Sequence, residues 1–315
     1  MNIQEMIEKK AKQNLKKILL IEGEDERVIK AAKLAAKGKV CIPVLLANIN
    51  SNSKGIETID YKNHPELKTF AKELYELRKH KGMTIEKAKE LLKNPNYFGA
   101  LMLKLGKVDG AVGGCKFSTA EWMRPVFQII GTKEGVKTVS AVCFFIVKDK
   151  VYFFSDTDFN IKPDNEQLAQ IAINAADFVK GIGIKPKVAL LSYSTKGSGE
   201  HESLQPIREA LAIIKKKRAD IIIDGELQFD AAINPDAAKK KYPGSAIKGD
   251  ANVLIFPDIT VGNVLIHALT QLTNYRFFGS FPVGLTKPIM NGGRSFDAKQ
   301  ILDVITACAM ECNLE

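Results

Sequence analysis

Apolar and polar positions alternate along this chain in the way typical of an α/β protein. Five times, a short run of aliphatic and β-branched residues ends abruptly in a polar loop, within residues 17–27, 105–114, 186–198, 218–230 and 251–263. Runs such as VALL, DIII and NVLIF lack period-two alternation, which favours strands buried on both faces of a parallel sheet. Ligands bind beyond the carboxyl ends of such strands, so the pattern predicts a ligand-binding α/β protein, in the first instance an enzyme.

Between these runs, apolar residues recur at the spacing of one helix face. They predict helices over residues 25–36, 65–81, 85–93, 97–105, 117–130, 166–180 and 297–315. Residues 138–154 instead predict an antiparallel hairpin at the edge of a sheet. Residues 48–63 are polar and predict a surface segment.

The charge balance leaves two interpretations open. The formal net charge is +10 and the pI about 9.2, which favours either general solubility or polyanionic partners. The basic residues are scattered, without interleaved aromatics or a nucleic-acid-binding motif, so we expect no nucleic-acid partner. A phosphate-rich small molecule remains compatible with the charge.

Cysteine usage and hydropathy indicate the compartment. The five cysteines are odd in number and have no CxxC spacing, which favours a reduced protein with packed thiols such as Cys308 and Cys312. No apolar stretch reaches membrane-spanning length, and the first 17 residues lack the apolar core of a secretory signal. We therefore expect a cytoplasmic protein with no membrane partner. Four well-separated histidines make a zinc site improbable, and we expect no bound metal.

Two loops of the second half have alternative interpretations. Residues 192–198 (SYSTKGS) follow a strand, and they either bind an anion or only cap a helix. Residues 224–230 (DGELQFD) carry three acids, which either hold a divalent metal or form structural hydrogen bonds. We favour the structural role for the acids.

Cations and hydroxyls in the first half and at the end of the chain are candidate anion-binding groups. Ser118, Thr119 and Arg124 lie on the first turns of one predicted helix, where they could flank a phosphate and its extension. Residues 287–296 (KPIMNGGRSF) place Arg294 beside two glycines, and a guanidinium there suits a phosphate or carbonyl oxygen. Arg78, by composition alone, is a surface residue.

Taken in order, these segments resemble the phosphate acetyltransferase family, which includes phosphate butyryltransferases. The matching stretches run almost from end to end: IEGEDERV, RKHKGMT, STAEWMRP, SDTDFNIKPDNEQLAQIA, LSYSTKGS, DGELQFDAA, GDANVLIFPDITVGN and GLTKP. The resemblance implies two α/β domains with mainly parallel sheets facing a cleft, an architecture like that of isocitrate and isopropylmalate dehydrogenases. It implies a first domain of residues 1–137 plus 289–315, a second of residues 138–288, and a homodimer.

The resemblance also implies the reaction and the residues that carry it. The family exchanges a short acyl group between acetyl phosphate and coenzyme A, with coenzyme A as a substrate and no bound cofactor. Arg294 matches the family arginine at the phosphate and carbonyl. The implied substrate-binding residues are Arg78, Ser118, Thr119, Arg124, Lys287 and Gly293.

The last loop departs from the family pattern. Aligned without gaps, the family's serine falls on Gly293 and its acid on Gln300, so we hypothesise that Ser295 and Asp297 replace them as catalytic groups. The departure also motivates an alternative function, a non-catalytic relative that binds coenzyme A or acyl phosphate. A metal-dependent decarboxylating dehydrogenase of related fold is a weaker alternative, because the chain shows neither a second carboxylate cluster nor a dinucleotide fingerprint.

Overall fold

The computed structural model describes residues 3–47 and 55–314, and the chain divides into two compact units. Unit 1 comprises residues 1–133 and 285–315, and unit 2 comprises residues 134–284. The C-terminal segment thus belongs to the same unit as the N-terminal third. The domain boundaries after residues 137 and 288 remain a prediction about independent folding.

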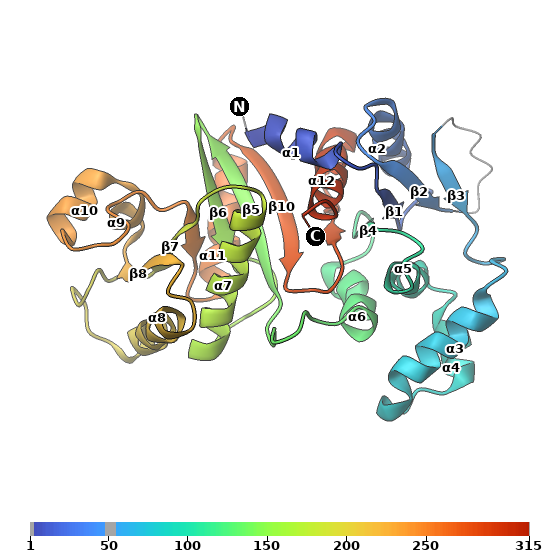
Figure 1. Ribbon diagram of the computed structural model, residues 1–315, viewed down its shortest axis with the longest axis horizontal. Helices are drawn as coiled ribbons and strands as arrows, with labels where there is room; N and C mark the ends of the chain where they lie inside the picture. The colour runs from blue at the N-terminus through green and yellow to red at the C-terminus, as the bar shows by residue number, and fades with distance from the viewer. Residues whose placement is uncertain (1–2, 48–54, 315) are drawn as a thin grey trace. The chain divides into compact units, whose positions relative to one another are not determined.

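Unit 1 is built on a parallel sheet in the strand order β11-β4-β1-β2-β3 (Figure 1). The strands are β1 (Lys17–Leu20), β2 (Ile42–Leu46), β3 (Glu57–Ile59), β4 (Gly110–Gly113) and β11 (Ile289–Asn291). Nearly every side chain of β1, β2 and β4 is buried, as the apolar runs predict for strands covered on both faces.

The polar segment 48–63 contains a strand that the sequence pattern did not predict. Strand β3 pairs in parallel with β2 at the edge of the sheet, whereas residues 48–54 lie outside the described part of the chain. An edge strand that stays half exposed needs no apolar run, so its sequence resembles that of a surface loop.

Helices cover both faces of this sheet. They are α1 (Ile3–Ala11), α2 (Glu26–Lys37), α3 (Leu67–Arg78), α4 (Ile85–Leu91), α5 (Pro95–Lys104), α6 (Thr119–Ile129) and α12 (Ala298–Glu311), with the 3₁₀ turn η1 (Lys79–Lys81). Figure 1 shows α1, α2 and α12 together on one side and α5 and α6 on the other. Helix α12 approaches β4 closely, because a Cβ on Gly110 would lie 2.7 Å from Cys308 Sγ and 2.8 Å from Cys312 Sγ. Both thiols are buried in this contact.

Unit 2 holds a mixed sheet in the order β10-β5-β6-β9-β7-β8. The strands are β5 (Ser140–Val147), β6 (Lys150–Ser155), β7 (Lys187–Leu191), β8 (Ile222–Leu227), β9 (Val253–Ile255) and β10 (Arg276–Val283). The β5–β6 hairpin is antiparallel as predicted, and β6, β9, β7 and β8 are mutually parallel. The prediction that the hairpin forms the sheet edge was wrong. Strand β10 pairs outside β5, and its glycine and proline interrupt the apolar run that would have revealed it.

The helices of unit 2 follow its parallel strands. They are α7 (Asn165–Gly181), η2 (Glu202–Leu204), α8 (Gln205–Lys217), α9 (Phe229–Ile233), α10 (Pro235–Lys241) and α11 (Ile259–Leu272). Helix α7 begins at a capping box formed by Asp164 and Gln167, and it ends at Gly181. Within residues 3–47 and 55–314, no helix is long and apolar enough to cross a bilayer.

Candidate active site

Three polar loops of unit 1 leave the sheet at the same edge. Strands β11, β4 and β1 are adjacent and parallel, so the segments 292–297, 114–118 and 21–25 follow their carboxyl ends side by side. Backbone bonds continue the pairing beyond the strands, from Gly292 N to Gly113 O at 2.7 Å and from Ile21 N to Val112 O at 3.0 Å. We call these three segments the loop cluster. It brings together Ser118, Gly293, Arg294, Ser295 and Asp297.

Arg27, in the first turn of α2, connects all three loops. The carboxylate of Asp25 caps α2 and accepts hydrogen bonds from Arg27 Nε at 3.1 Å and from Nη2 at 2.9 Å. Arg27 Nη1 donates to the carbonyls of Arg294 at 2.8 Å and Phe296 at 2.9 Å, and Nη2 donates to the carbonyl of Cys115 at 2.9 Å. These contacts match the five N–H donors of a guanidinium. The hydrogen bonds from Arg27 also lower the pKa of Asp25.

Glu22 binds the backbone of the loop after β4 through hydrogen bonds. Its Oε1 accepts the backbone N–H of Gly114 at 2.8 Å and that of Lys116 at 3.2 Å. Its Oε2 is buried and has no hydrogen-bond partner among the described residues. Burial raises the pKa of Glu22, and the backbone hydrogen bonds from Lys116 and Gly114 oppose this effect.

Helix α6 begins at the end of this loop. Ser118 and Glu121 form a capping box: Ser118 Oγ donates to Glu121 Oε2 at 2.7 Å and accepts from the N–H of Glu121 at 3.3 Å. The pKa of Glu121 is lowered chiefly by Ser118, with smaller contributions from the positive charges of Arg294 and Arg124. Both arginines are exposed and lie within electrostatic reach of the same carboxylate.

The loop after β11 is a tight turn that exposes two side chains. Phe296 N donates to Gly293 O at 3.3 Å, and the residues between them, Arg294 and Ser295, are exposed. Gly293 has φ +67°, and a Cβ there would lie 2.8 Å from the Phe296 ring. A serine at position 293 would therefore be strained and would collide with that ring.

Asp297 and Gln300 are engaged with each other at the start of α12. Asp297 Oδ1 accepts the backbone N–H of Lys299 at 2.8 Å and that of Gln300 at 2.9 Å. Gln300 Oε1 in turn accepts the N–H of Asp297 at 2.9 Å, which completes a capping box. Asp297 is exposed and caps the helix through one carboxylate oxygen, and Gln300 completes the cap.

The remaining predicted residues lie outside the hydrogen-bonded part of the loop cluster. Arg78 is the last residue of α3 and half-buried, and its Nε is buried without a hydrogen-bond partner in the described part of the chain. Lys287, also half-buried, precedes β11, and Thr119 is the first residue of α6.

The loop after β7 uses its own donors internally. Thr195 N donates to Ser198 Oγ at 2.9 Å, Gly197 N to Glu226 Oε1 at 2.9 Å and Gly199 N to Ser194 Oγ at 3.0 Å. The N–H groups of residues 194, 196 and 198 are also bonded within the loop or to Glu226. Residues 194–199 therefore have no free backbone donor for an anion, and the structural interpretation of this segment is favoured.

The three acids of residues 224–230 also have structural partners; Asp224 and Glu226 lie within β8, and Asp230 lies in α9. Asp224 accepts backbone N–H groups from Gly225 and Ala246, both at 3.0 Å. Glu226 accepts from Arg208 Nη2 at 3.0 Å, and Asp230 pairs with Lys241 at 2.7 Å. Across residues 3–47 and 55–314, no group of His, Cys, Asp and Glu is arranged to hold a metal ion.

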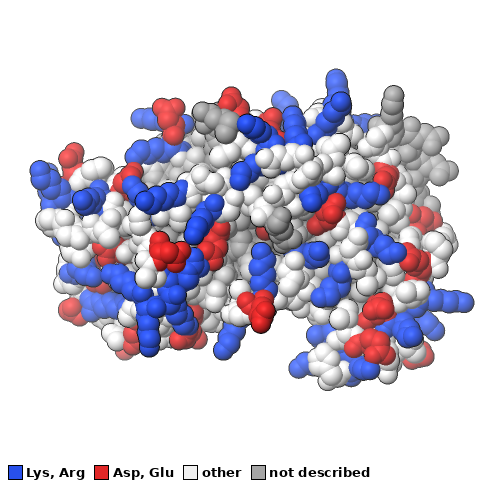
Figure 2. Space-filling view, in the orientation of Figure 1, with Lys and Arg blue, Asp and Glu red and all other residues white. Residues whose placement is uncertain are grey.

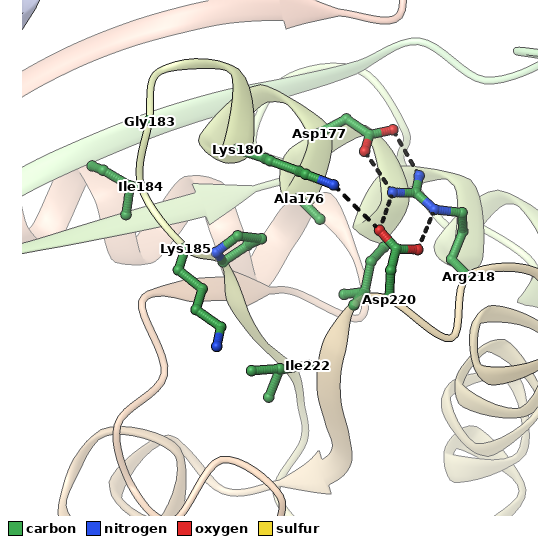
Figure 3. Close-up of a pocket in the computed structure, with 11 residues that line it drawn as sticks. Ala176, Asp177, Lys180, Gly183, Ile184, Lys185, Arg218, Asp220 and Ile222 are labelled. Carbon is green, nitrogen blue, oxygen red and sulfur yellow. Dashed lines mark hydrogen bonds and ion pairs between the residues drawn. The ribbon is translucent and has the colours of Figure 1, made fainter.

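A pocket in unit 2, at the amino ends of β7 and β8, contains Arg218, a second arginine that joins separate segments of the chain (Figure 3). Arg218 makes bidentate contacts with Asp177, both at 2.9 Å, and with Asp220 at 2.8 and 2.9 Å. Lys180 adds an ion pair with Asp220 at 3.5 Å. These acids occupy the donors of Arg218, so the cluster joins α7 to the start of β8.

The basic surplus is dispersed on the surface. Figure 2 shows Lys and Arg interspersed with Asp and Glu over the visible face of both units. Dispersed charge of this kind favours solubility.

The comparisons with known proteins agree with this fold. Solved structures of 4-hydroxythreonine-4-phosphate dehydrogenases share the fold at 11% identity, with a TM-score of 0.57 for the enzyme from Salmonella typhimurium. The chain thus has a dehydrogenase-like α/β fold. A phosphotransacetylase from Streptococcus pyogenes superposes with a TM-score of 0.93 at 34% identity, over 99% of each chain.

Sequence relationships define the family. The profile of the family described as phosphate acetyl/butaryl transferase matches residues 2–309, and the chain belongs to this family. A phosphate acetyltransferase from Thermoanaerobacterium thermosaccharolyticum is 40% identical over 99% of both chains. Another, from Bacillus subtilis, is 38% identical over 92% of this chain and 94% of its own length.

Sequence reasoning did not single out Arg27, Glu22 or Glu121. The first two lie in the polar segment IEGEDER after the first strand, and that position was the available signal. Their roles depend on hydrogen bonds to residues about a hundred or more positions away, which spacing within the segment cannot reveal.

The raised pKa of Glu22 predicts a pH-dependent difference in stability. Its unfolded pKa is about 4.3, so its stabilising contribution is complete below that pH and is lost as the pH rises through the higher folded value. Glu22→Gln keeps Oε1 as an acceptor and cannot ionise. We expect the free energy of unfolding of the variant, relative to wild type, to increase from about pH 4 upward in urea titrations.

Glu121→Gln is the matched control, because the pKa of Glu121 is lowered. The relative stability of that variant should decrease as the pH rises toward about 4 and stay constant above it, since an ionised Glu121 stabilises the folded state and that contribution is complete above the unfolded pKa. A difference between wild type and Glu22→Gln that stays constant with pH would contradict the first prediction.

Proposed function

We propose that this protein is a phosphate acetyltransferase, which exchanges an acetyl group between acetyl phosphate and coenzyme A. The reaction is acetyl-CoA + phosphate = CoA + acetyl phosphate, with coenzyme A as a substrate and no bound cofactor. The observation that carries the proposal is that Arg294 of the loop cluster and Arg124 of α6 both act electrostatically on the carboxylate of Glu121 in α6, in a chain whose family transfers acyl groups to or from phosphate.

The chemistry needs a base and a group that stabilises negative charge. A coenzyme A thiol, with an ordinary pKa near ~8.5, must lose its proton before its sulfur attacks the acetyl carbonyl carbon. A bond forms between the coenzyme A sulfur and the acetyl carbon. The bond between that carbon and the bridging oxygen breaks, and phosphate leaves with this oxygen and the electron pair. Arg294 is the catalytic cation at the carbonyl and departing phosphate. The substrate-binding groups are Arg78, Ser118, Thr119, Arg124, Lys287 and the backbone at Gly293.

Ser295 and Asp297 are the proposed replacements for the family's serine and acid. Ser295 is exposed next to Arg294 in the same turn, and Asp297 is exposed at the N-terminus of α12. Neither Gly293 nor Gln300 can take these roles, because one has no side chain and the other is an amide engaged in the cap. The alternative is a non-catalytic relative that binds coenzyme A or acyl phosphate. An assay of acetyl transfer distinguishes the two, because only the enzyme turns over its substrates.

Mixing the protein with acetyl phosphate and coenzyme A should consume the thiol and form acetyl-CoA. We expect Arg294→Ala to lower kcat by about 10²–10³-fold, as removal of a charge-stabilising donor does in other acyl transfers. Thermal unfolding of the variant should match wild type, since the guanidinium is exposed. Folded wild-type protein that binds coenzyme A but forms no acyl-CoA from any short acyl phosphate would favour the non-catalytic alternative.

Asp297→Asn separates the base from the helix cap. Asparagine is as good an N-cap as aspartate, so α12 should begin unchanged while the carboxylate is lost. We expect kcat to fall by about 10²–10⁴-fold at neutral pH, the range of general-base catalysis, with partial recovery as the pH approaches the thiol's own pKa. Full turnover in Asp297→Asn would exclude Asp297 as the base.

Two further proposals concern the cellular context. The five cysteines are buried and unpaired, which supports a cytoplasmic location where thiols stay reduced. Exposed apolar side chains on and beside α11, among them Ile161, Val261, Val264 and Leu272, support a homodimer. Two of these residues, Ile161 and Val261, line a groove of about 1180 Å³ in unit 2.

Val264→Asp tests the proposed dimer. Val264 is 63% exposed in the single chain, so a charge there should not disturb folding but should weaken an apolar contact between copies. Light scattering should give wild type a mass near twice 34.7 kDa and shift the variant toward 34.7 kDa. Lys216→Asp, an equally exposed change on α8, should leave the mass unchanged. A monomeric wild type would contradict the proposal.

A further inference from the structure

Arg27 contacts the backbone of Arg294. Its Nη1 donates to the carbonyl of Arg294 at 2.8 Å and to that of Phe296 at 2.9 Å. Its other donors bind the carboxylate of Asp25 and the carbonyl of Cys115. A guanidinium that already makes these contacts has no N–H left for a substrate.

We propose that Arg27 is a positioning residue for Arg294, which fixes the turn that carries the catalytic guanidinium and acts on the reaction only through that turn. This inference rests on the proposed acetyltransferase function. It assigns a role to a residue of the first loop of the cluster that lies outside the set of substrate-binding groups.

The contacts of the turn explain why such a residue is needed. Gly293 at the start of the turn has a left-handed backbone, φ +67°, which glycine adopts without strain but also leaves readily. Within the turn, one hydrogen bond of 3.3 Å joins Phe296 N to Gly293 O. The two carbonyls held by Arg27 flank Ser295, so the tether fixes the backbone on both sides of the exposed residues.

Charge neutralisation separates positioning from direct electrostatic catalysis. The carboxylate of Asp25, only 8% exposed, forms an ion pair with Arg27 at 2.9 Å. The pair is nearly neutral as seen from a substrate, so its geometric effect should dominate. Lysine at position 27 would keep the positive charge but replace the planar fork by one ammonium nitrogen, which cannot reach all three loops.

The first experiment measures the turn without relying on activity. Hydrogen exchange of the amides within residues 293–297 should be faster in Arg27→Lys than in wild type, because the turn loses its tether. Arg218→Lys is the matched control, since Arg218 also joins two segments, α7 and the residues before β8, but belongs to unit 2. It should leave exchange in this segment unchanged. Equal exchange in Arg27→Lys and wild type would overturn the tether.

The second experiment is a double-mutant cycle in the acetyltransferase assay. Arg27→Lys should lower kcat by about 10- to 100-fold, the cost of a small misplacement, and change KM for either substrate by less than about threefold. In the Arg294→Ala background the same substitution should change kcat by less than about twofold, because there is no guanidinium left to position.

The outcomes distinguish this inference from the proposed function. Losses that multiply in the double variant, or a loss confined to KM, would show that Arg27 acts directly on a substrate and would overturn the positioning role alone. A folded wild-type protein without turnover of any short acyl phosphate would overturn the proposed function itself. Arg218→Lys should keep wild-type kcat in every case where the enzyme is active.

Discussion

A parallel sheet leaves backbone groups without strand partners where its strands end, and this constraint shapes the loop cluster of unit 1. Buried carbonyls and N–H groups there must find other partners. Two side chains meet the need from the first loop. Glu22 accepts N–H groups from the loop after β4, and Arg27 donates to carbonyls of the loops after β4 and β11. Glu22, a hydrogen-bond acceptor, and Arg27, a hydrogen-bond donor, thus join segments that lie far apart in sequence.

The same arrangement explains why the cluster can present exposed cations. The N–H groups of the Arg27 guanidinium donate to backbone carbonyls and to Asp25. The guanidinium groups of Arg124 and Arg294 are exposed instead, and their charges act on Glu121. Internal and external arginines therefore have separate tasks within one site. Unit 2 shows the contrast, because Arg208 and Arg218 are both paired with acids and the loop after β7 bonds its own N–H groups.

The sequence predicted the buried strands, most helices, the hairpin and the family, because these depend on local apolar patterns or on motifs in order. It did not predict β3, β10 and β11, whose edge positions need no continuous apolar run. It placed Arg294, Ser295 and Asp297 near one another through simple adjacency. The roles of Arg27 and Glu22 were not predicted, because their hydrogen-bond partners lie in other loops. Hydrogen bonds between residues far apart in sequence produce no periodic pattern in the chain.

The contact between Gly293 and the Phe296 ring has a consequence for how this loop can change over time. A Cβ at position 293 would lie 2.8–3.0 Å from three carbons of that ring. A serine at position 293 would therefore require the Phe296 ring to shift or to be replaced by a smaller side chain, and it would strain the left-handed backbone. Substitutions at the two positions are thus coupled, because the cost of losing the glycine depends on the side chain at position 296.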